Sequence, residues 1–330
     1  MAVSNQPTSP LQPSEPLLAG AAVGSRAQLA GRVVGKGRWA GAWLQSPRLV
    51  VGLLLLMVFV VTGIVGPLVV VHPNAFVGPL LAPPSSHFLL GTTQTGQAVL
   101  AQLVVSTGGS LEVGFAAGAI ATCVSILVGV GGGFLGGRLD EVLALFTNVV
   151  LVIPALPLII IIAAYVHTGG EGAVILVIAL TSWAAAARVL RSQTLSVRNR
   201  DYVLAARVSG ERSWRIVLVE ILPNELAVVV SQFIFTVIFA VLTQAGLAFL
   251  GLASTNSLTW GTMLYYAEND QALSAGAWWW FVPPGLCIAL LGTSLALVNF
   301  GLDEVLNPRL RVRGRGGFWS QRLERRERRP

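Results

Sequence analysis

The sequence predicts an all-α polytopic membrane protein with six transmembrane helices. Of the 330 residues, 54% are hydrophobic and 11% are charged, whereas soluble domains carry about 25% charged residues. The apolar residues gather into runs, and roughly 20 consecutive ones suffice for a helix to cross a bilayer. The expected spans are residues 49–71, 111–135, 142–166, 172–189, 226–252 and 279–301.

The basic residues predict how these spans are oriented, because cytoplasmic loops carry an excess of lysine and arginine. All 22 Lys and Arg residues fall in the two tails, in the short loop after the second span and in the segment 188–224. The segments 72–110, 167–171 and 253–278 hold none. We therefore expect both termini in the cytoplasm and these three segments outside. We assign the net charge of +7 to orientation and to contact with membrane lipids, not to nucleic acid.

The N-terminal tail, residues 1–48, is expected to be cytoplasmic, and its first 24 residues are rich in Pro, Ser, Ala and Gly, which predicts disorder. The first apolar run starts too late for a secretory signal, so 49–71 is expected to remain as the first span. The outer segment 72–110 contains several prolines that interrupt regular structure. From Thr95 on, it is expected to form either an amphipathic surface helix or a membrane-entry loop.

Small residues and prolines distinguish the next two spans. The second span is rich in glycine, which lets neighbouring helices approach closely. These glycines are Gly129, Gly131, Gly132, Gly133, Gly136 and Gly137. The third span contains Pro154 and Pro157, so it is expected to be kinked.

The C-terminal part begins with a polar and aromatic outer segment, 253–278. The run Trp278-Trp279-Trp280 lies where the sixth span enters the membrane, and we expect it to form an aromatic anchor at the outer interface. The basic tail 302–330 is expected to lie in the cytoplasm.

No residue pattern predicts a metal site or a catalytic site. Cys123 and Cys287 lie inside predicted spans, no CxxC pattern occurs, and the chain has only 3 His. The phosphate-binding pattern G-x-x-x-x-G-K-[ST] is also missing, so we expect that the chain does not hydrolyse ATP on its own.

The polar segment 198–224 predicts two helices joined by a sharp turn on the cytoplasmic side. Asp201 in a first turn suits the positive end of a helix dipole. Ala205 and Ala206 are small enough for another protein surface to approach the backbone. Gly210 can then end this helix, because glycine adopts a positive φ at little cost.

The second helix of this segment is expected to start near Ser213 and to lead to Pro223. Proline has a fixed φ and no N–H, which suits the first turn of the fifth span. Two short helices that project from the membrane can transmit the motion of an attached protein to the spans.

Several stretches of the chain together resemble the C-type permease subunits of dipeptide, oligopeptide and nickel ABC importers. Residues 201–224 resemble EYVxAARxxGASxxRIIxRHILPN, the EAA loop of that family. HFLLGTTQTGQAVLAQL (87–103) is similar to HPLGTDxxGRDVLSRL, and GGFLGGRLDEVLALFTNVVLVIPALPL (132–158) to GYFGGxxDxxLMRxxDxxLAFPxLLL. LAFLGLASTNSLTWGTML (247–264) resembles LSFLGLGxxPPxPSWGxML, and LNPRLR (306–311) resembles LDPRLR.

The resemblance implies a type I ABC importer (MetI-like) permease fold in the cell membrane, with an extra N-terminal span before a five-helix core at 111–301. It implies a homologous second permease, two ATP-binding subunits and an extracytoplasmic substrate-binding protein as partners. ATP and Mg would be used by the partner subunits, and this chain would bind no cofactor. Residues 198–224, the coupling segment, would dock on the ATPase through Asp201, Ala205, Ala206, Arg207, Gly210, Glu211, Arg212, Trp214 and Arg215.

Some positions depart from the family pattern. Thr93, Gln97 and Ala98 stand where the family has Asp, Arg and Asp, which removes the charges of any salt-bridged contact there. Asp201 stands in place of Glu, so the charge is kept on a shorter side chain.

The transport path is expected to be lined by small and weakly polar side chains, because a substrate held tightly in mid-membrane would leave slowly. Each candidate can instead form a hydrogen bond within the helix packing. The candidates are Ser125, Thr147, Asn148, Ser231, Gln232, Thr236, Thr243 and Gln244.

Two other classes of function are compatible with a polytopic membrane protein. An ion-coupled secondary transporter or channel usually keeps charged residues at mid-membrane, whereas Glu112 and Glu225 lie near span ends. A scaffold or membrane enzyme is the other alternative, and an enzyme would need a catalytic group of residues. The substrate stays open among dipeptides, oligopeptides, nickel chelates, haem and glutathione.

Overall fold

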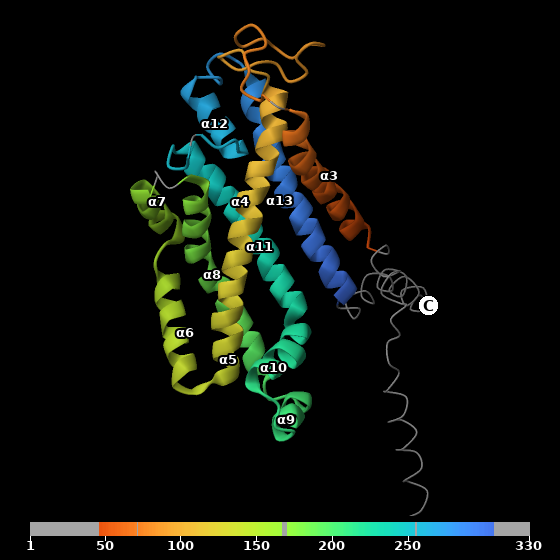
Figure 1. Ribbon diagram of the computed structural model, residues 1–330, viewed down its shortest axis with the longest axis vertical. Helices are drawn as coiled ribbons and strands as arrows, with labels where there is room; N and C mark the ends of the chain where they lie inside the picture. Colours follow the sequence, from red (N-terminus) through yellow and green to blue (C-terminus); the bar gives the residue numbers. More distant parts are fainter. Residues whose placement is uncertain (1–45, 71, 167–169, 255, 307–330) are drawn as a thin grey trace, which may run out of the picture. The chain divides into compact units, whose positions relative to one another are not determined.

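The computed structural model describes residues 46–70, 72–166, 170–254 and 256–306. Five of its helices are long and apolar enough to cross a membrane, and a bent helix pair is a sixth candidate (Figure 1). The predicted class, an all-helical polytopic membrane protein, is therefore confirmed. The expected disorder of residues 1–24 and the basic tail beyond 306 lie outside the described residues.

The helices follow one another along the chain, and the longest connection joins α3 to α4. They are α3 (Pro47–Val69), α4 (Val99–Ser125), α5 (Gly131–Leu135), α6 (Gly137–Val152), α7 (Ala155–Val166), α8 (Gly170–Val197), α9 (Asp201–Val208), α10 (Ser213–Ile216), α11 (Leu222–Phe249), α12 (Trp260–Asn269) and α13 (Trp278–Leu306). The π-helical stretches η2 (Ile126–Val130) and η4 (Val217–Ile221) join α4 to α5 and α10 to α11. Val99–Leu135 and Ser213–Phe249 are thus helical paths of 37 residues each, about 55 Å long.

The second span begins at Val99, not at residue 111. Of the two alternatives for the segment from Thr95, the separate surface helix is not formed. The added turns are polar, and their polar side chains are buried against neighbouring segments. Gln102 is 8% exposed, and Ser110 accepts a hydrogen bond from the backbone N–H of Trp260 at 2.9 Å. The hydropathy pattern placed the start of this helix too late, because the polar side chains of Gln102 and Ser110 are buried and hydrogen-bonded inside the protein.

The third span is a broken pair, not the single helix expected over 142–166. Helices α6 and α7 meet at an angle of 84°. Ile153 ends α6 in an extended conformation with ψ 124°, as proline requires of the residue before it. The kink predicted at Pro154 is confirmed.

The outer segment 253–278 contains a helix, α12, that the sequence analysis missed. Thr259 caps its N-terminus, and Thr262 completes a reciprocal capping box. The expected aromatic anchor is wrong for Trp280, which is 2% exposed. Trp279 is half-buried and donates a hydrogen bond to the carbonyl of Thr92, and Trp278 is 54% exposed.

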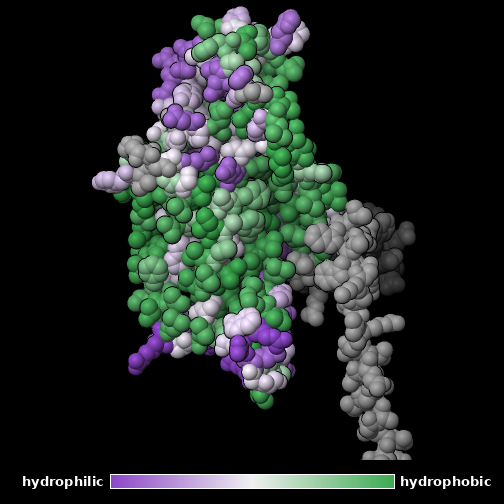
Figure 2. Space-filling model, in the orientation of Figure 1, coloured by the Kyte–Doolittle hydropathy of each residue, from purple (hydrophilic) through white to green (hydrophobic). Residues whose placement is uncertain are grey.

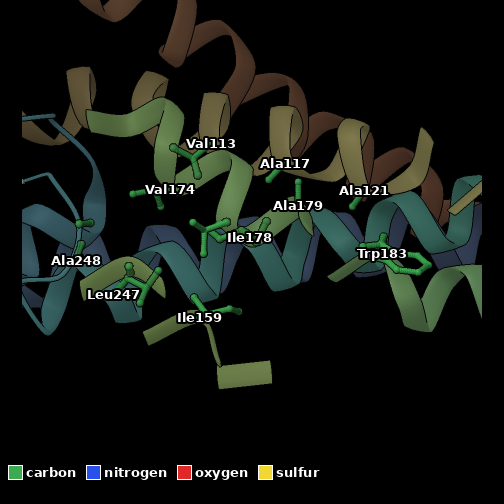
Figure 3. Packing of buried hydrophobic residues seen from close by; sticks show 14 of the residues in the cluster. Val113, Ala117, Ala121, Ile159, Val174, Ile178, Ala179, Trp183, Leu247 and Ala248 are labelled. Atoms are coloured by element: carbon green, nitrogen blue, oxygen red, sulfur yellow. The ribbon is translucent and has the colours of Figure 1, made fainter. Parts of the chain in front are cut away.

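Helix α8 contacts α4, α6, α7 and α11, and the largest core cluster forms around it (Figure 3). In Figure 3, Ala117 and Ala121 of α4 lie beside Ala179 and Ile178 of α8. A Cβ on Gly129 would lie 2.4 Å from the carbonyl oxygen of Ala187, which confirms that glycine in the second span permits close helix contact.

Among the described helices, the first and the last, α3 and α13, pack along each other. The Ser294 hydroxyl donates a hydrogen bond to the carbonyl of Gly52 at 2.9 Å. Closer to the start of α3, Glu304 accepts hydrogen bonds from Ser46 at 2.6 Å and from Arg48 at 3.2 Å. The first span is therefore held by the last one.

Hydrophobic side chains cover the middle of the face shown in Figure 2, and hydrophilic ones gather at its two ends. Helices α9 and α10 lie at one end, and α12 lies at the other (Figure 1). This distribution is typical of a protein whose middle faces lipid.

Candidate functional site

The coupling segment forms a helix–turn–helix at the end opposite α12, as predicted. Helix α9 ends in a Schellman motif: the N–H of Glu211 bonds to the carbonyl of Ala206 at 3.1 Å, and that of Gly210 to Arg207 at 3.0 Å. Gly210 has φ +77°, and a Cβ there would meet no atom within 4 Å. The turn therefore needs glycine for its backbone conformation and not for space.

Buried contacts hold the coupling segment against the helices above it. Val203 of α9 is 0% exposed and joins Phe134, Leu190 and Ile216 in one apolar cluster. The guanidinium carbon of Arg207 lies 4.7 Å from the centre of the Phe134 ring, a cation–π contact between α9 and α5.

Two of the predicted ATPase-contact residues pair with each other across the turn. Arg215 of α10 forms an ion pair with Glu211 one helical turn earlier. Asp201 lies in the first turn of α9, as predicted. Ala205, Arg212 and Trp214 are exposed, and Ala206 is half-buried.

The coupling segment also exposes large apolar side chains, which the sequence analysis did not single out. Val208 is 89% exposed and Trp214 is 60% exposed. Leu204 and Tyr202 are 44% and 38% exposed. We call these four residues the tip patch. Loss of hydration raises the pKa of Tyr202, and nearby carboxylates add to the shift while Arg200 opposes it, so this hydroxyl stays neutral at physiological pH.

Helix α10 continues into α11 through η4 without a break. Pro223 lies in the first turn of α11, where it lacks an N–H and crowds the carbonyl four residues earlier. The π stretch immediately before it widens the helix and accommodates this conflict. Trp214 of the tip patch is thereby joined to the fifth span by one continuous helical path, and the other three residues lie on α9 across the turn.

A buried polar contact fixes the base of this path. Glu225 of α11 is 2% exposed and accepts a hydrogen bond from the Thr194 hydroxyl of α8 at 3.1 Å. Arg198, at the end of α8, donates to the carbonyl of Gly133 in α5 at 2.9 Å. Helices α5, α8 and α11 thus meet where the coupling segment begins.

A groove of about 380 Å³ lies between α8, α11 and the bend of α6 and α7. Leu151 and Ala155 contribute from the two sides of the bend, and Gln232 and Thr236 contribute from α11. Helix α8 adds Thr181 and Ser182, which the sequence analysis missed. We call this the polar groove after these four side chains, although most of its lining surface is apolar.

The structure brings only Gln232 and Thr236 of the eight path candidates into the polar groove. Ser125 is 0% exposed and its hydroxyl bridges α4 to the Trp183 carbonyl of α8, which favours a packing role. Gln244 is 3% exposed and donates to Thr259 at 2.8 Å.

The other four candidates also lie outside the groove lining. Thr147 and Thr243 are buried and Ser231 is half-buried. Asn148 is exposed and accepts a hydrogen bond from Arg188 at 2.8 Å. Asn148 lies on α6 and Arg188 lies on α8, and both helices border the groove.

Neutral hydrogen bonds hold the outer loop around Thr93 and Gln97, two of the positions where the resemblance leads one to expect charged residues. The Thr93 hydroxyl, on a residue 1% exposed, accepts from the N–H of Gln97 at 3.1 Å. The Gln97 amide donates to the carbonyl of Asn74 at 3.1 Å. The loop keeps its hydrogen-bonded shape without the charges.

Comparison with known proteins gives one consistent family. A family model described as the binding-protein-dependent transport system inner membrane component matches residues 121–312. The di/tripeptide transport system permease protein DppC of Pseudomonas aeruginosa (strain UCBPP-PA14) is 33% identical over 269 residues, which cover 79% of this chain and 88% of that protein.

Two relatives from other bacteria are similar over the same region. The dipeptide transport system permease protein DppC of Bacillus subtilis (strain 168) is 30% identical over 267 residues, 79% of this chain and 81% of that protein. The oligopeptide transport system permease protein OppC of Lactococcus lactis subsp. lactis (strain IL1403) is 32% identical over 238 residues, 71% of this chain and 79% of that protein. With these matches and its membrane-spanning helices, the chain belongs to the family of binding-protein-dependent transport system inner membrane components.

Proposed function

We propose that this chain is a permease subunit of an ATP-driven ABC importer that takes up di- or oligopeptides delivered by an extracytoplasmic binding protein. Family membership supports the transport role, and the names of the curated relatives support the peptide class. A second, homologous permease and two ATP-binding subunits would complete the complex. ATP and Mg belong to those subunits in this proposal, and this chain supplies the path.

The tip patch is the observation that carries the proposal. Val208 and Trp214 are 89% and 60% exposed at an end of the molecule where the neighbouring side chains are polar and charged. Exposed apolar patches rimmed by polar residues mark protein interaction sites. The Ala205 position beside them lets a partner surface approach the backbone. We assign this surface to the ATPase and place it, with both termini, in the cytoplasm.

The continuous path from Ser213 to Phe249 gives the docked ATPase a way to act on the polar groove. Gln232 and Thr236 lie on this helix and line the groove. Movement of the tip patch would turn α11 against the α6–α7 bend and change the width of the groove. The polar groove would then be this subunit's part of the transport path.

The test is purification of the complex from membranes that express tagged wild-type chain, Val208→Asp or the matched control Val208→Thr. A charge in the centre of a buried interface should cost at least about 2 kcal/mol. We expect wild type and Val208→Thr to retain ATP-binding subunits, and Val208→Asp to lose them while remaining folded in the membrane. Retention of the ATPase by Val208→Asp would contradict the docking assignment. Mass spectrometry of the co-purified binding protein and its ligand then tests the peptide class.

A further inference from the structure

A polar cavity of about 440 Å³ lies at the end of the molecule that carries α12. Its wall combines Asn74 and Gln97 of the outer loop, Gln102 of α4, Tyr266 and Asp270 at α12, and Trp280 of α13. We call it the outer pocket. These residues are far apart in the sequence, and the pocket exists only because the outer loop, α12 and the start of α13 pack together.

The outer pocket carries a negative charge that no described basic residue balances. Asp270 is the C-cap of α12, so its carboxylate adds to the negative end of a helix dipole. The sequence segments 72–110 and 253–278 contain no Lys or Arg, and none of the ion pairs among the described residues involves Asp270. Partial burial raises the pKa of Asp270, as expected for a carboxylate that loses water and gains no cation.

The remaining wall is suited to hold a cation. Tyr266 and Trp280 offer aromatic rings, which attract ammonium and guanidinium groups. The amide of Gln102 donates to Gln97 at 2.6 Å and to Asn74 at 3.2 Å, so these side chains are already fixed. A carboxylate, aromatic rings and fixed amides are the groups that bind a lysine or arginine side chain.

We propose that the outer pocket receives one lysine or arginine side chain of the extracytoplasmic binding protein when that protein docks. This rests on the proposed function, which places a binding protein at this end of the molecule. Charge favours this occupant over an anionic lipid headgroup, whose phosphate the unpaired Asp270 would repel. The pocket attracts a positively charged side chain because the residues at positions 93, 97 and 98 are uncharged and leave the negative charge of Asp270 without a neutralising partner.

The first experiment measures the electrostatic potential of the pocket without any partner. Asn256 lines the pocket, and it is changed to Cys after Cys123→Ala and Cys287→Ala. The probes are a cationic trimethylammonium methanethiosulfonate and an anionic sulfonate methanethiosulfonate. We expect the cation to react faster, and Asp270→Asn to lower the cation-to-anion rate ratio about fivefold. Glu268→Gln, an exposed carboxyl two residues away, is the matched control and should leave the ratio nearly unchanged. An unchanged ratio in Asp270→Asn overturns the proposal.

The second experiment measures docking of the complex's own binding protein on the complex in nanodiscs over a range of salt concentrations. We expect Asp270→Asn to weaken docking about tenfold and to flatten its salt dependence, with Glu268→Gln close to wild type. Wild-type docking that Asp270→Asn leaves unchanged overturns the inference and leaves the proposed function intact. Unchanged docking with reduced uptake of cationic peptides alone also overturns it, because the pocket would then recognise cargo. A wild-type complex that docks no binding protein counts against the proposed function instead.

Discussion

Pro154 and Pro223 lie in the membrane-spanning part of this permease with opposite results. At Pro154 the chain breaks, and α6 and α7 meet at 84°. At Pro223 the chain remains helical from Ser213 to Phe249. The difference lies in the preceding residues: Ile153 is extended, whereas η4 places a widened turn before Pro223. At these two sites, the proline forms a hinge or is absorbed according to whether the turn before it widens.

The two regions face each other across the polar groove. Leu151 and Ala155 come from the broken pair, and Gln232 and Thr236 come from the continuous helix. The wall formed by α6 and α7 is bent. The wall formed by α11 belongs to one continuous helical path that reaches the tip patch at Trp214. The comparison predicts that transport depends on the continuity of this path far more than on the proline of the bend.

The largest effect is expected from interrupting the continuous helical path Ser213–Phe249. Leu218 lies within η4 and is 52% exposed, so Leu218→Pro removes a backbone N–H without emptying the core. A proline inside a helix costs about 3 kcal/mol or more. We expect uptake to be abolished while the ATPase still binds and hydrolyses ATP. The control Leu218→Ala should transport, and coupled transport by Leu218→Pro would show that a continuous helical path is not needed.

The next effect is expected from filling the polar groove. Gln232 lines it and is half-buried, so Gln232→Trp should block peptide uptake while the yield of assembled complex is kept. Ser125→Trp is the contrasting variant, because Ser125 is 0% exposed and a large side chain there should lower the yield. Uptake assays and the amount of purified complex separate the two. Normal uptake by Gln232→Trp would remove the groove from the transport path.

A smaller effect is expected at the turn between α9 and α10. A β-branched residue with positive φ costs roughly 1–2 kcal/mol, so Gly210→Val should reduce coupled ATPase activity and transport about tenfold. Gly172→Val is the control, because a Cβ there also meets no atom within 4 Å and the backbone is not in the positive-φ region. Full transport by Gly210→Val would contradict the role of this turn in coupling.

The smallest effect is expected at the bend. Pro154→Ala frees Ile153 to become helical, but Ile159 of α7 is 0% exposed and belongs to the core around α8. We therefore expect the bend and most of the uptake to be kept. Pulsed-EPR distances between labels near the two far ends of α6 and α7 measure this directly. A straightened pair with normal uptake would show that the bend itself is unnecessary.

The sequence was sufficient for features that depend on local chemistry or on long runs. Apolar runs located the spans, and glycine at position 210 gave the positive φ of the turn. The predicted kink at Pro154 followed from the missing N–H of proline. The roles of the coupling residues, and the orientation of the termini, stay predictions.

Features that depend on what a side chain touches could not be read from one sequence. Ser125 and Thr236 looked alike as polar residues in apolar spans, yet one lies in the packing and the other in the groove. Helix α12 had a readable signal in its threonine capping pair, which the aromatic composition obscured. The outer pocket joins Asn74 to Asp270, and no periodicity reports contact between segments so far apart.

The pairing of α3 with α13 has a consequence for biogenesis. The groups that satisfy Arg48 and the Gly52 carbonyl belong to Glu304 and Ser294, which the ribosome synthesises last. During insertion, α3 must wait in the bilayer with its packing face open to lipid or to the insertion machinery. A chain that stops before α13 keeps the contacts of α3 with α4 but leaves the side of α3 that faces α13 without a partner, so degradation of incomplete subunits can begin at this exposed face.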